Sequence, residues 1–333
     1  MKADVMEHHT KTGSGWGNQM EGYQIAWEII GQVKQVIQGK DACIQKLLAA
    51  MLAGGHILID DIPGVGKTTM ALAFAGAMRL SYSRLQFTPD VMPSDVTGFY
   101  LYEKERGQFR YQPGPVMCNL FLADEINRTS PKTQSALLEV MEEGQVTLEG
   151  KTHPVPKPFT VIATQNPVGS AGTQLLPDSQ LDRFAVCLTV GYPSPENEIQ
   201  ILKGRQRGNP LELVSPVADG NSLLYMQQQV ERIFVHDAIL KYITALSGAT
   251  REHPQLVLGL SPRASLALSR MAKASAYLSG RDYVLPEDVA ALFPDVAVHR
   301  LLPSPRARAA HVTVRDIMGE ILKQVPRPAL RGR

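Results

Sequence analysis

The sequence predicts an α/β fold in which a three-layer αβα phosphate-loop domain with a mostly parallel sheet is followed by an all-α lid domain. Apolar runs with the character of strands alternate with helical patterns as far as Val190, which is typical of βαβ units. A glycine-rich loop joins the first of these runs to a helix. Beyond Pro195 the pattern is almost entirely helical, which predicts a domain boundary near residue 192.

Composition is that of a globular protein from a reducing compartment. The chain has 333 residues, enough for two domains, of which 44% are apolar and 20% charged. Its three cysteines lie far apart and have no neighbouring cluster of His or Cys, so they fit neither a zinc site nor a disulfide framework. We therefore expect a cytoplasmic protein. No run approaches the ~20 apolar residues that cross a bilayer, so we expect no membrane insertion.

The chain divides into three expected segments. Residues 1–20 are polar and lack the apolar core of a signal peptide, which predicts a flexible leading segment. Residues 21–191 form the predicted nucleotide-binding domain, and residues 192–333 form the helical lid. The expected strands begin at residue 57 and then cover 84–88, 119–125, 159–164 and 184–190, with hairpins over 99–111 and 145–155. The main expected helices are 21–52 with one break, 131–142, 196–205, 222–233, 236–247, 262–278, 286–292 and 311–324.

The loop after the first strand carries a phosphate-binding pattern. Its residues are Asp61, Ile62, Pro63, Gly64, Val65, Gly66, Lys67, Thr68 and Thr69. They fit G-x-x-x-x-G-K-[ST] except at the first position, where Asp61 replaces glycine. Backbone N–H groups of such a loop and of the following helix bind phosphate, Lys67 contacts the β- and γ-phosphates, and the Thr68 hydroxyl binds Mg²⁺. Val36 and Ile37, upstream of the first strand, are expected to contact the adenine ring.

Two adjacent carboxylates, Asp124 and Glu125, end another buried strand. In phosphate-loop enzymes an acid at this point holds Mg²⁺, often through water, which makes Asp124 the second candidate metal residue. Glu125 can accept a proton from an attacking water or orient that water. Asn166 ends the following strand, and its amide can hold the water against the γ-phosphate.

Two arginines are candidates for stabilising the charge that develops on a transferred phosphate. Arg183 stands at the start of the last strand of the first domain, where it could equally pair with Asp182 or a neighbouring acid. Arg263 follows Ser261 and Pro262, which are typical of a helix N-cap and first turn. We expect this helix start to direct Arg263 back toward the first domain.

Seven motifs in this order closely resemble the MoxR family of AAA+ ATPases, over about residues 25–325. They are Asp61 to Thr68, Phe87-Thr88-Pro89-Asp90, Pro93-Ser94-Asp95, Leu122-Ala123-Asp124-Glu125-Ile126-Asn127-Arg128, Ala163-Thr164-Gln165-Asn166-Pro167, Gln180-Leu181-Asp182-Arg183-Phe184 and Leu260-Ser261-Pro262-Arg263. The resemblance implies ATP with Mg²⁺ and a homo-oligomeric ring, usually a hexamer, with active sites between neighbours. It matches Asn166 to sensor 1, Arg263 to sensor 2 and Arg183 to an arginine finger. The hairpins match the helix-2 insert and the pre-sensor-1 hairpin.

The resemblance also implies chaperone-like remodelling or activation of partner proteins, often beside a protein with a von Willebrand factor A domain. Whether Arg183 is the finger, and whether Arg263 acts within its own subunit or on a neighbour, stays open. A second hypothesis is a helicase-like nucleic-acid motor or a magnesium-chelatase-like ATPase subunit, because the hairpins carry basic and aromatic side chains. Cross-strand packing explains those aromatics more simply, and we expect no nucleic-acid partner. A third hypothesis is a nucleotide-gated binding module with little turnover.

Overall fold

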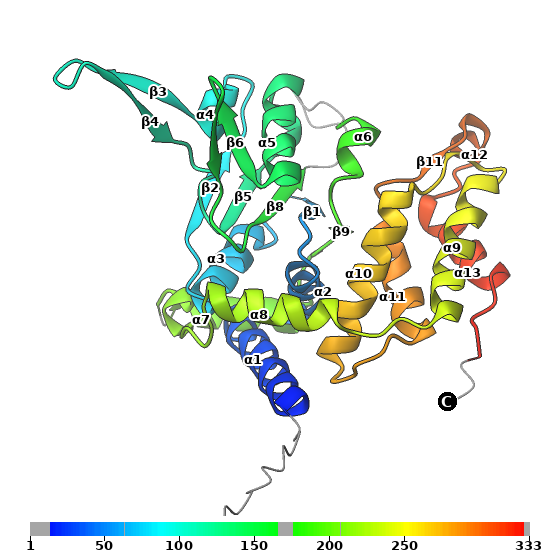
Figure 1. The fold of residues 1–333 in the computed structure, drawn as a ribbon. Helices are drawn as coiled ribbons and strands as arrows, with labels where there is room; N and C mark the ends of the chain where they lie inside the picture. The colour runs from blue at the N-terminus through cyan, green and yellow to red at the C-terminus, as the bar shows by residue number, and fades with distance from the viewer. Residues whose placement is uncertain (1–13, 63, 166–175, 207, 330–333) are drawn as a thin grey trace, which may run out of the picture.

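The structure is a computed structural model that describes residues 14–62, 64–165, 176–206 and 208–329. Figure 1 shows an α/β body, a hairpin that reaches away from it, and a group of helices on the opposite side of the body. Among the described helices, none combines the length and the hydropathy that a membrane span requires.

Five parallel strands form the central sheet, in the order β2-β5-β8-β1-β9. They are β1 (Ile57–Asp60), β2 (Tyr82–Gln86), β5 (Leu120–Asp124), β8 (Thr160–Gln165) and β9 (Val186–Leu188). Because all five run in the same direction, their carboxyl ends and the loops that follow lie at one edge of the sheet. In open sheets of this kind, that edge is where ligands bind.

Both faces of the sheet are covered by helices, which confirms the predicted three-layer architecture. Alternate residues of a strand point to opposite faces. Ile57 and Ile59 join one apolar cluster with α2 (Asp41–Leu52) and α3 (Lys67–Ala77), whereas Leu58 joins the other with α5 (Pro131–Glu143). Helix α1 (Ser14–Val36) packs against α3. Burial on both sides explains why these strands are continuous apolar runs in the sequence.

Along the chain, two antiparallel hairpins come between strands of the sheet, as predicted. The first pairs β3 (Gly98–Glu103) with β4 (Gln108–Pro113) and projects from the body (Figure 1), and the second pairs β6 (Gln145–Leu148) with β7 (Lys151–Pro154). His153 of the second hairpin stacks on Tyr111 of the first, with ring centroids 3.9 Å apart, and accepts or donates a 2.9 Å hydrogen bond to the Tyr100 hydroxyl. The two hairpins therefore pack against each other at their bases.

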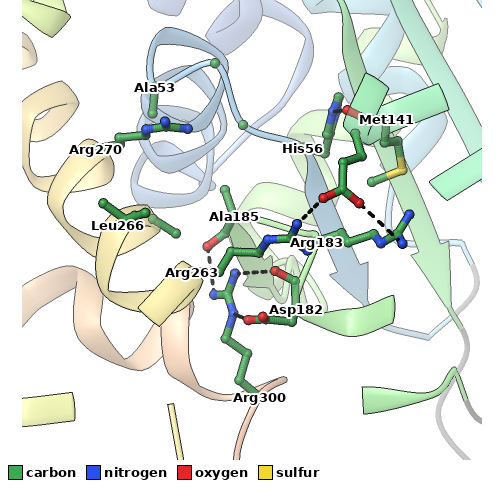
Figure 2. A pocket seen from close by; sticks show the side chains of 14 residues that line it. Ala53, His56, Met141, Asp182, Arg183, Ala185, Arg263, Leu266, Arg270 and Arg300 are labelled. Carbon is green, nitrogen blue, oxygen red and sulfur yellow. Dashed lines mark hydrogen bonds and ion pairs between the residues drawn. The ribbon is translucent and has the colours of Figure 1, made fainter. Parts of the chain in front are cut away.

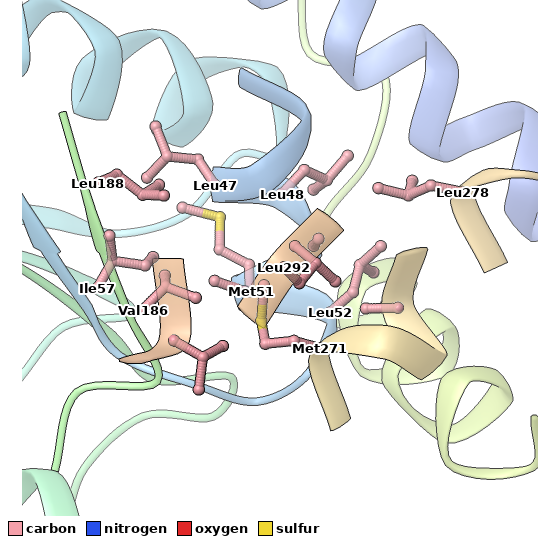
Figure 3. Close-up of a cluster of buried hydrophobic side chains, with 14 of the residues drawn as sticks. Leu47, Leu48, Met51, Leu52, Ile57, Val186, Leu188, Met271, Leu278 and Leu292 are labelled. Atoms are coloured by element: carbon pink, nitrogen blue, oxygen red, sulfur yellow. The ribbon is translucent and has the colours of Figure 1, made fainter. Parts of the chain in front are cut away.

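The second half of the chain is mainly helical and docks beside the sheet. Its helices are α7 (Pro195–Gln206), η2 (Pro210–Leu213), α8 (Gly220–Glu231), α9 (Asp237–Glu252), α10 (Pro262–Leu278), α11 (Pro286–Ala297), α12 (Pro305–Ala309) and α13 (Val314–Gln324). Met271 of α10 and Leu292 of α11 pack with Met51 of α2 and Val186 of β9 in one cluster (Figure 3). Helices α10 and α11 are thus fixed to the side of the first domain that α2 and β9 form.

Several elements differ from the expected ones. Helix α11 continues through Pro294 to Ala297, beyond its expected end at residue 292, because Phe293 and Val296 are buried and offset the lost backbone hydrogen bond. The short pair of β10 (Leu256–Leu258) and β11 (Leu302–Pro303), and the short helices α4 (Pro93–Thr97), η1 (Ile126–Arg128) and α6 (Asp178–Leu181), were not predicted. Helix α1 begins at Ser14, so the helix includes part of the leading segment expected to be flexible.

Candidate active site

The loop after β1 turns directly into helix α3. Gly64 and Gly66 have φ values of +86° and +92°, a backbone region in which other residues are strained. Gly66 is the N-cap of α3, so the first N–H groups of the helix face the loop and can bind an anion. A cavity of about 360 Å³ lies there, and its lining consists of Gly64, Gly66, Lys67, Thr68, Thr69, Arg84, Gln86, Asp124 and Glu125.

The ammonium group of Lys67 is held at the start of the loop. Its Nζ donates a 2.8 Å hydrogen bond to the carbonyl oxygen of Asp61. Burial lowers the pKa of Lys67 from its ordinary value, and the nearby carboxylates of Asp61 and Asp124 oppose this shift. Because Lys67 also lines the cavity, its Nζ is placed where an incoming phosphate could replace the carbonyl as its partner.

Asp61 supports the loop from behind. Its buried Oδ1 accepts from the N–H of Ile62 at 2.8 Å, and its Oδ2 accepts from the N–H groups of Val190 and Gly191, both at 2.6 Å. Neither Asp61 nor Ile62 is among the described residues that line the phosphate cavity. The residue that replaces the first glycine of the pattern thus connects the loop to the segment after β9.

The two acids at the end of β5 are positioned by Thr164 of β8. The Thr164 hydroxyl donates to Asp124 Oδ1 at 2.6 Å and accepts from the N–H of Glu125 at 2.9 Å. Glu125 has a left-handed backbone, with φ +57°, and its Oε2 lies 2.7 Å from a terminal nitrogen of Arg128. Sequence reasoning missed Thr164, although a hydroxyl in a fully buried strand requires a polar partner and could have drawn attention to it.

Arg84 of β2 is a further residue that sequence reasoning missed. Its guanidinium group donates to Asp124 Oδ2 at 2.6 Å and to Gln86 Oε1 at 2.9 Å. Strand β2 is the neighbour of β5, with Arg84 beside Leu122, which brings the side chain to the phosphate cavity. Both oxygens of Asp124 are therefore engaged by protein groups.

The donor set of the cavity fits Mg²⁺. The Thr68 hydroxyl and the Asp124 carboxylate supply hard oxygen ligands, and Mg²⁺ is commonly held by one or two such groups together with phosphate and water. Among the described residues, no group of three or more His, Cys, Asp or Glu side chains could hold a metal by itself. When bound, Mg²⁺ supplies positive charge for the phosphate oxygens.

A second cavity, of about 470 Å³, adjoins the phosphate cavity and shares Gly64, Gly66 and Thr69 with it. Val36 and Ile37 line it together with Val65. The structure therefore brings both candidate adenine contacts next to the loop, in an apolar space large enough for a nucleoside.

Arg183 and Arg263 lie elsewhere. They line a third cavity, of about 370 Å³, whose lining includes Gly55 and His56 just before β1 and Ala185 just before β9 (Figure 2). This cavity is therefore at the amino ends of the strands, whereas the phosphate loop follows their carboxyl ends. Four residues of β1, at about 3.3 Å each, separate the two edges by roughly 10 Å or more. Neither arginine is among the described residues that line the phosphate cavity of its own chain.

Both arginines contact Glu142 of helix α5. A terminal nitrogen of Arg183 is 3.3 Å from Glu142 Oε2, and a terminal nitrogen of Arg263 pairs with Oε1. Arg263 thus does reach the first domain, as the helix start predicted, but its partner there is this carboxylate. Asp182, the alternative partner of Arg183, is instead 2.8 Å from Nε of the buried Arg300.

Two expected site residues, Pro63 and Asn166, lie outside the described part of the chain. Among the residues that are described, Lys67, Thr68, Asp124 and Glu125 are brought together at one cavity, as expected. Arg183 and Arg263 are brought together at another, with Arg270 and Arg300 beside them.

Four features together define the class of this protein as a AAA+ ATPase. They are the five-stranded parallel sheet, the phosphate loop, the two acids at the end of β5 and the helical second half. Residues 56–186 match the family described as "ATPase family associated with various cellular activities (AAA)", and residues 248–321 match the family described as "AAA lid domain".

Full-length relatives place the chain more narrowly. It is 44% identical to "Uncharacterized protein YeaC" of Bacillus subtilis (strain 168), over 94% of this chain and 99% of that one. It is 39% identical to "Chaperone MoxR1" of Mycobacterium tuberculosis, over 98% of this chain and 88% of that one. A crystal structure of a protein from Cytophaga hutchinsonii has a TM-score of 0.88 and 36% identity, and the match covers 94% of this chain and 98% of that one. The chain belongs to the MoxR family of AAA+ ATPases.

Proposed function

We propose that this chain hydrolyses ATP with Mg²⁺ in a ring of identical subunits, and that each catalytic site is built from two of them. The observation that supports this proposal is the separation of the candidate residues onto two edges of the sheet. Lys67 and Glu125 lie at the carboxyl edge, whereas Arg183 and Arg263 lie at the amino edge. A neighbour whose amino edge faces the phosphate cavity would complete the site. Head-to-tail contacts form a ring when the rotation between neighbours closes, and we propose a closed ring of six subunits.

Each residue then has a role in phosphoryl transfer to water. Lys67 and the N-terminus of α3 bind the β- and γ-phosphates, and Thr68 and Asp124 would hold Mg²⁺. Glu125 accepts the proton of the attacking water, which Asn166 helps to hold. Arg183 and Arg263 of the neighbour stabilise the charge that develops on the γ-phosphate. Arginines supplied in this way can contribute ~10³–10⁵ in rate, so turnover would depend on assembly.

The cycle would drive chaperone-like remodelling or activation of partner proteins in the cytoplasm, including a protein with a von Willebrand factor A domain. The name of the M. tuberculosis relative supports a chaperone role. The β3–β4 hairpin offers the contact surface, because Phe99, Leu101 and Phe109 are at least half exposed on an element that projects from the body (Figure 1). Tyr100 and Tyr111 pack against His153 instead, so they serve the fold of the hairpins.

Two variants test the catalytic part. Lys67→Ala should abolish ATP binding, measured with a fluorescent ATP analogue, because no other described ammonium group lines the phosphate cavity. Glu125→Gln should bind ATP with unchanged affinity and fail to hydrolyse it. Turnover retained in the Glu125→Gln protein would remove that residue from the mechanism.

The same Glu125→Gln protein tests assembly and partners. With ATP and Mg²⁺ it should sediment as a closed oligomer. If the unmodified protein were a monomer whose turnover per subunit did not depend on protein concentration, the two-subunit site would be contradicted. Proteins that co-purify with it only in the presence of ATP are the expected partners. ATPase stimulation by single-stranded DNA, falling steeply with salt, would favour the nucleic-acid motor instead.

A further inference from the structure

We propose that Glu142 is a positioning residue, which pairs Arg183 with Arg263 and presents both to the γ-phosphate of the neighbouring subunit. This inference rests on the proposed function, in which the two arginines act on a neighbour's site. It adds a third residue to that half of the site, one that touches no phosphate itself.

The contacts of Glu142 connect the two domains. Arg183 lies in the loop before β9, Arg263 lies in the first turn of α10, and Glu142 lies in the last turn of α5. Each carboxylate oxygen takes one arginine, Oε2 for Arg183 at 3.3 Å and Oε1 for Arg263. Figure 2 shows the two guanidinium groups converging on one carboxylate from opposite sides. A single side chain of the core thus sets the distance between a core arginine and a lid arginine.

Charge balance around the cavity explains why a carboxylate is needed there. Arg270 and Arg300 line the same cavity as Arg183 and Arg263, and like charges gathered in one cavity repel one another. Among the described lining residues, Asp182 is the one other acid, and it is engaged by Arg300 and by the Ser261 hydroxyl. Without Glu142 the two arginines would separate, and their side chains would sample many rotamers.

The geometry leaves the arginines able to bind phosphate while Glu142 holds them. A guanidinium group has five N–H donors, and each arginine gives Glu142 only one terminal nitrogen in the contacts above. The side chains of Arg183 and Arg263 keep 30% and 46% of their surface exposed, so donors that Glu142 does not use remain accessible. Donors from both side chains can therefore meet the oxygens of one phosphate, and their fixed spacing reduces the entropy lost when that phosphate arrives.

Glu142→Ala and Glu142→Gln test the role, with Glu143→Gln as the matched control. Glu143 is the adjacent exposed carboxylate, and the ion pairs of both arginines are with Glu142 instead. We expect Glu142→Ala to lower kcat about tenfold or more. The KM for ATP should change less than about threefold, because the phosphate loop of the altered subunit is intact. The kcat of Glu142→Gln should lie between that of the unmodified protein and that of Glu142→Ala. Its amide has a single carbonyl oxygen, which can accept a strong hydrogen bond from only one of the two arginines. Equal kcat in Glu142→Ala and Glu143→Gln would overturn the proposal.

Mixing experiments separate this role from a structural one. Lys67→Ala subunits cannot bind ATP but keep Glu142 and both arginines. Mixed with Glu142→Ala subunits, they would supply paired arginines to intact phosphate loops, so the mixture should hydrolyse ATP faster than the sum of the two separate proteins. A mixture no faster than that sum would mean that Glu142 acts within its own subunit, and it would overturn the proposal.

A parallel mixture distinguishes the two proposals. Arg183→Ala with Lys67→Ala tests the shared site directly and does not involve Glu142. If that pair regains activity while Glu142→Ala with Lys67→Ala does not, the proposed function stands and the role of Glu142 is wrong. If neither pair regains activity, the shared site itself is contradicted.

Discussion

Asp61 Oδ2 accepts a 2.6 Å hydrogen bond from the backbone N–H of Val190. The neighbouring N–H of Gly191 donates to the same oxygen at the same distance, and the other carboxylate oxygen accepts from Ile62. Gly191 begins the link into the helical half of the chain, and Pro193 of that link lines the cavity beside the phosphate loop. One buried carboxylate therefore joins the proposed phosphate loop to the link between the sheet and the helical half of the chain.

Replacing Asp61 should cost stability. Asp61→Ala leaves three backbone N–H groups without their acceptor, so we expect the free energy of unfolding to fall by about 3 kcal/mol. Asp61→Gly, which restores the glycine of the general pattern, should be destabilised to a similar extent, because it loses the same carboxylate. Urea denaturation measures both, and Asp282→Ala is the control at an exposed aspartate. Stability equal to that of the control would show that these hydrogen bonds contribute nothing.

Thr164 should matter for catalysis although it touches no substrate. Thr164→Val keeps the shape of the side chain but removes the hydroxyl that contacts Asp124 and Glu125. Because such supporting groups are commonly worth about 10–100-fold, we expect kcat to fall within that range. Thr164→Ser, which keeps the hydroxyl, should retain most of the activity. Equal kcat in the valine and serine variants would show that this hydroxyl has no role in catalysis.

Arg84 should weaken Mg²⁺ binding at Asp124. Its guanidinium group occupies one oxygen of that carboxylate at 2.6 Å and adds a positive charge beside the proposed Mg²⁺ site. We therefore expect Arg84→Gln to lower the Mg²⁺ concentration that gives half-maximal ATPase activity about threefold to tenfold. Arg84→Lys, which keeps the charge, should resemble the unmodified protein. A titration of Mg²⁺ at saturating ATP decides, and a rise in the requirement of the Gln variant would be the opposite of what we expect.

His56 should make the protein less stable in mild acid. Burial lowers its pKa to about 4, and its Nδ1 accepts from the N–H of Val161 while Nε2 faces the carbonyl oxygen of Met141. Although His56 keeps some exposed surface, both ring nitrogens have partners inside the protein. The neutral form therefore belongs to the folded state, and the unfolded chain binds the proton first as pH falls.

The stabilisation that neutral His56 contributes is fully present above pH 6.5 and is lost as pH falls toward 4. From the difference between the two pKa values, the loss approaches about 3 kcal/mol. His56→Asn should lose less stability over that window, measured by urea denaturation at several pH values. Parallel pH profiles for the two proteins would contradict the assignment.

Much of the phosphate half of the site could be predicted because its determinants are local. The loop, helix α3 and the acids at the end of β5 each follow from neighbouring residues, and parallel strands bring their carboxyl ends together whatever the details of packing. The hairpins and most helix starts are also determined by neighbouring residues. At Ser261, for example, the side chain accepts from the N–H of Ala264.

The partners supplied by distant segments could not be predicted in this way. Apolar periodicity showed that α10 would be buried, but not that it would pack against α2. This packing brings Arg263 of α10 to the amino edge of the sheet. Glu142 and Arg84 are ordinary charged residues in sequence, and only the order of the strands and the docking of the helices give them their partners.

The proposed mechanism depends on one ATP being bound by two subunits. The most direct test is a cryo-electron microscopy structure of Glu125→Gln with ATP and Mg²⁺. We expect Lys67 of one subunit and Arg183 of its neighbour to lie within about 3 Å of oxygens of the same γ-phosphate, with Arg183 of the first subunit at the opposite edge of its own sheet. A γ-phosphate contacted by arginines of its own subunit alone, or by no arginine of a neighbour, would contradict it.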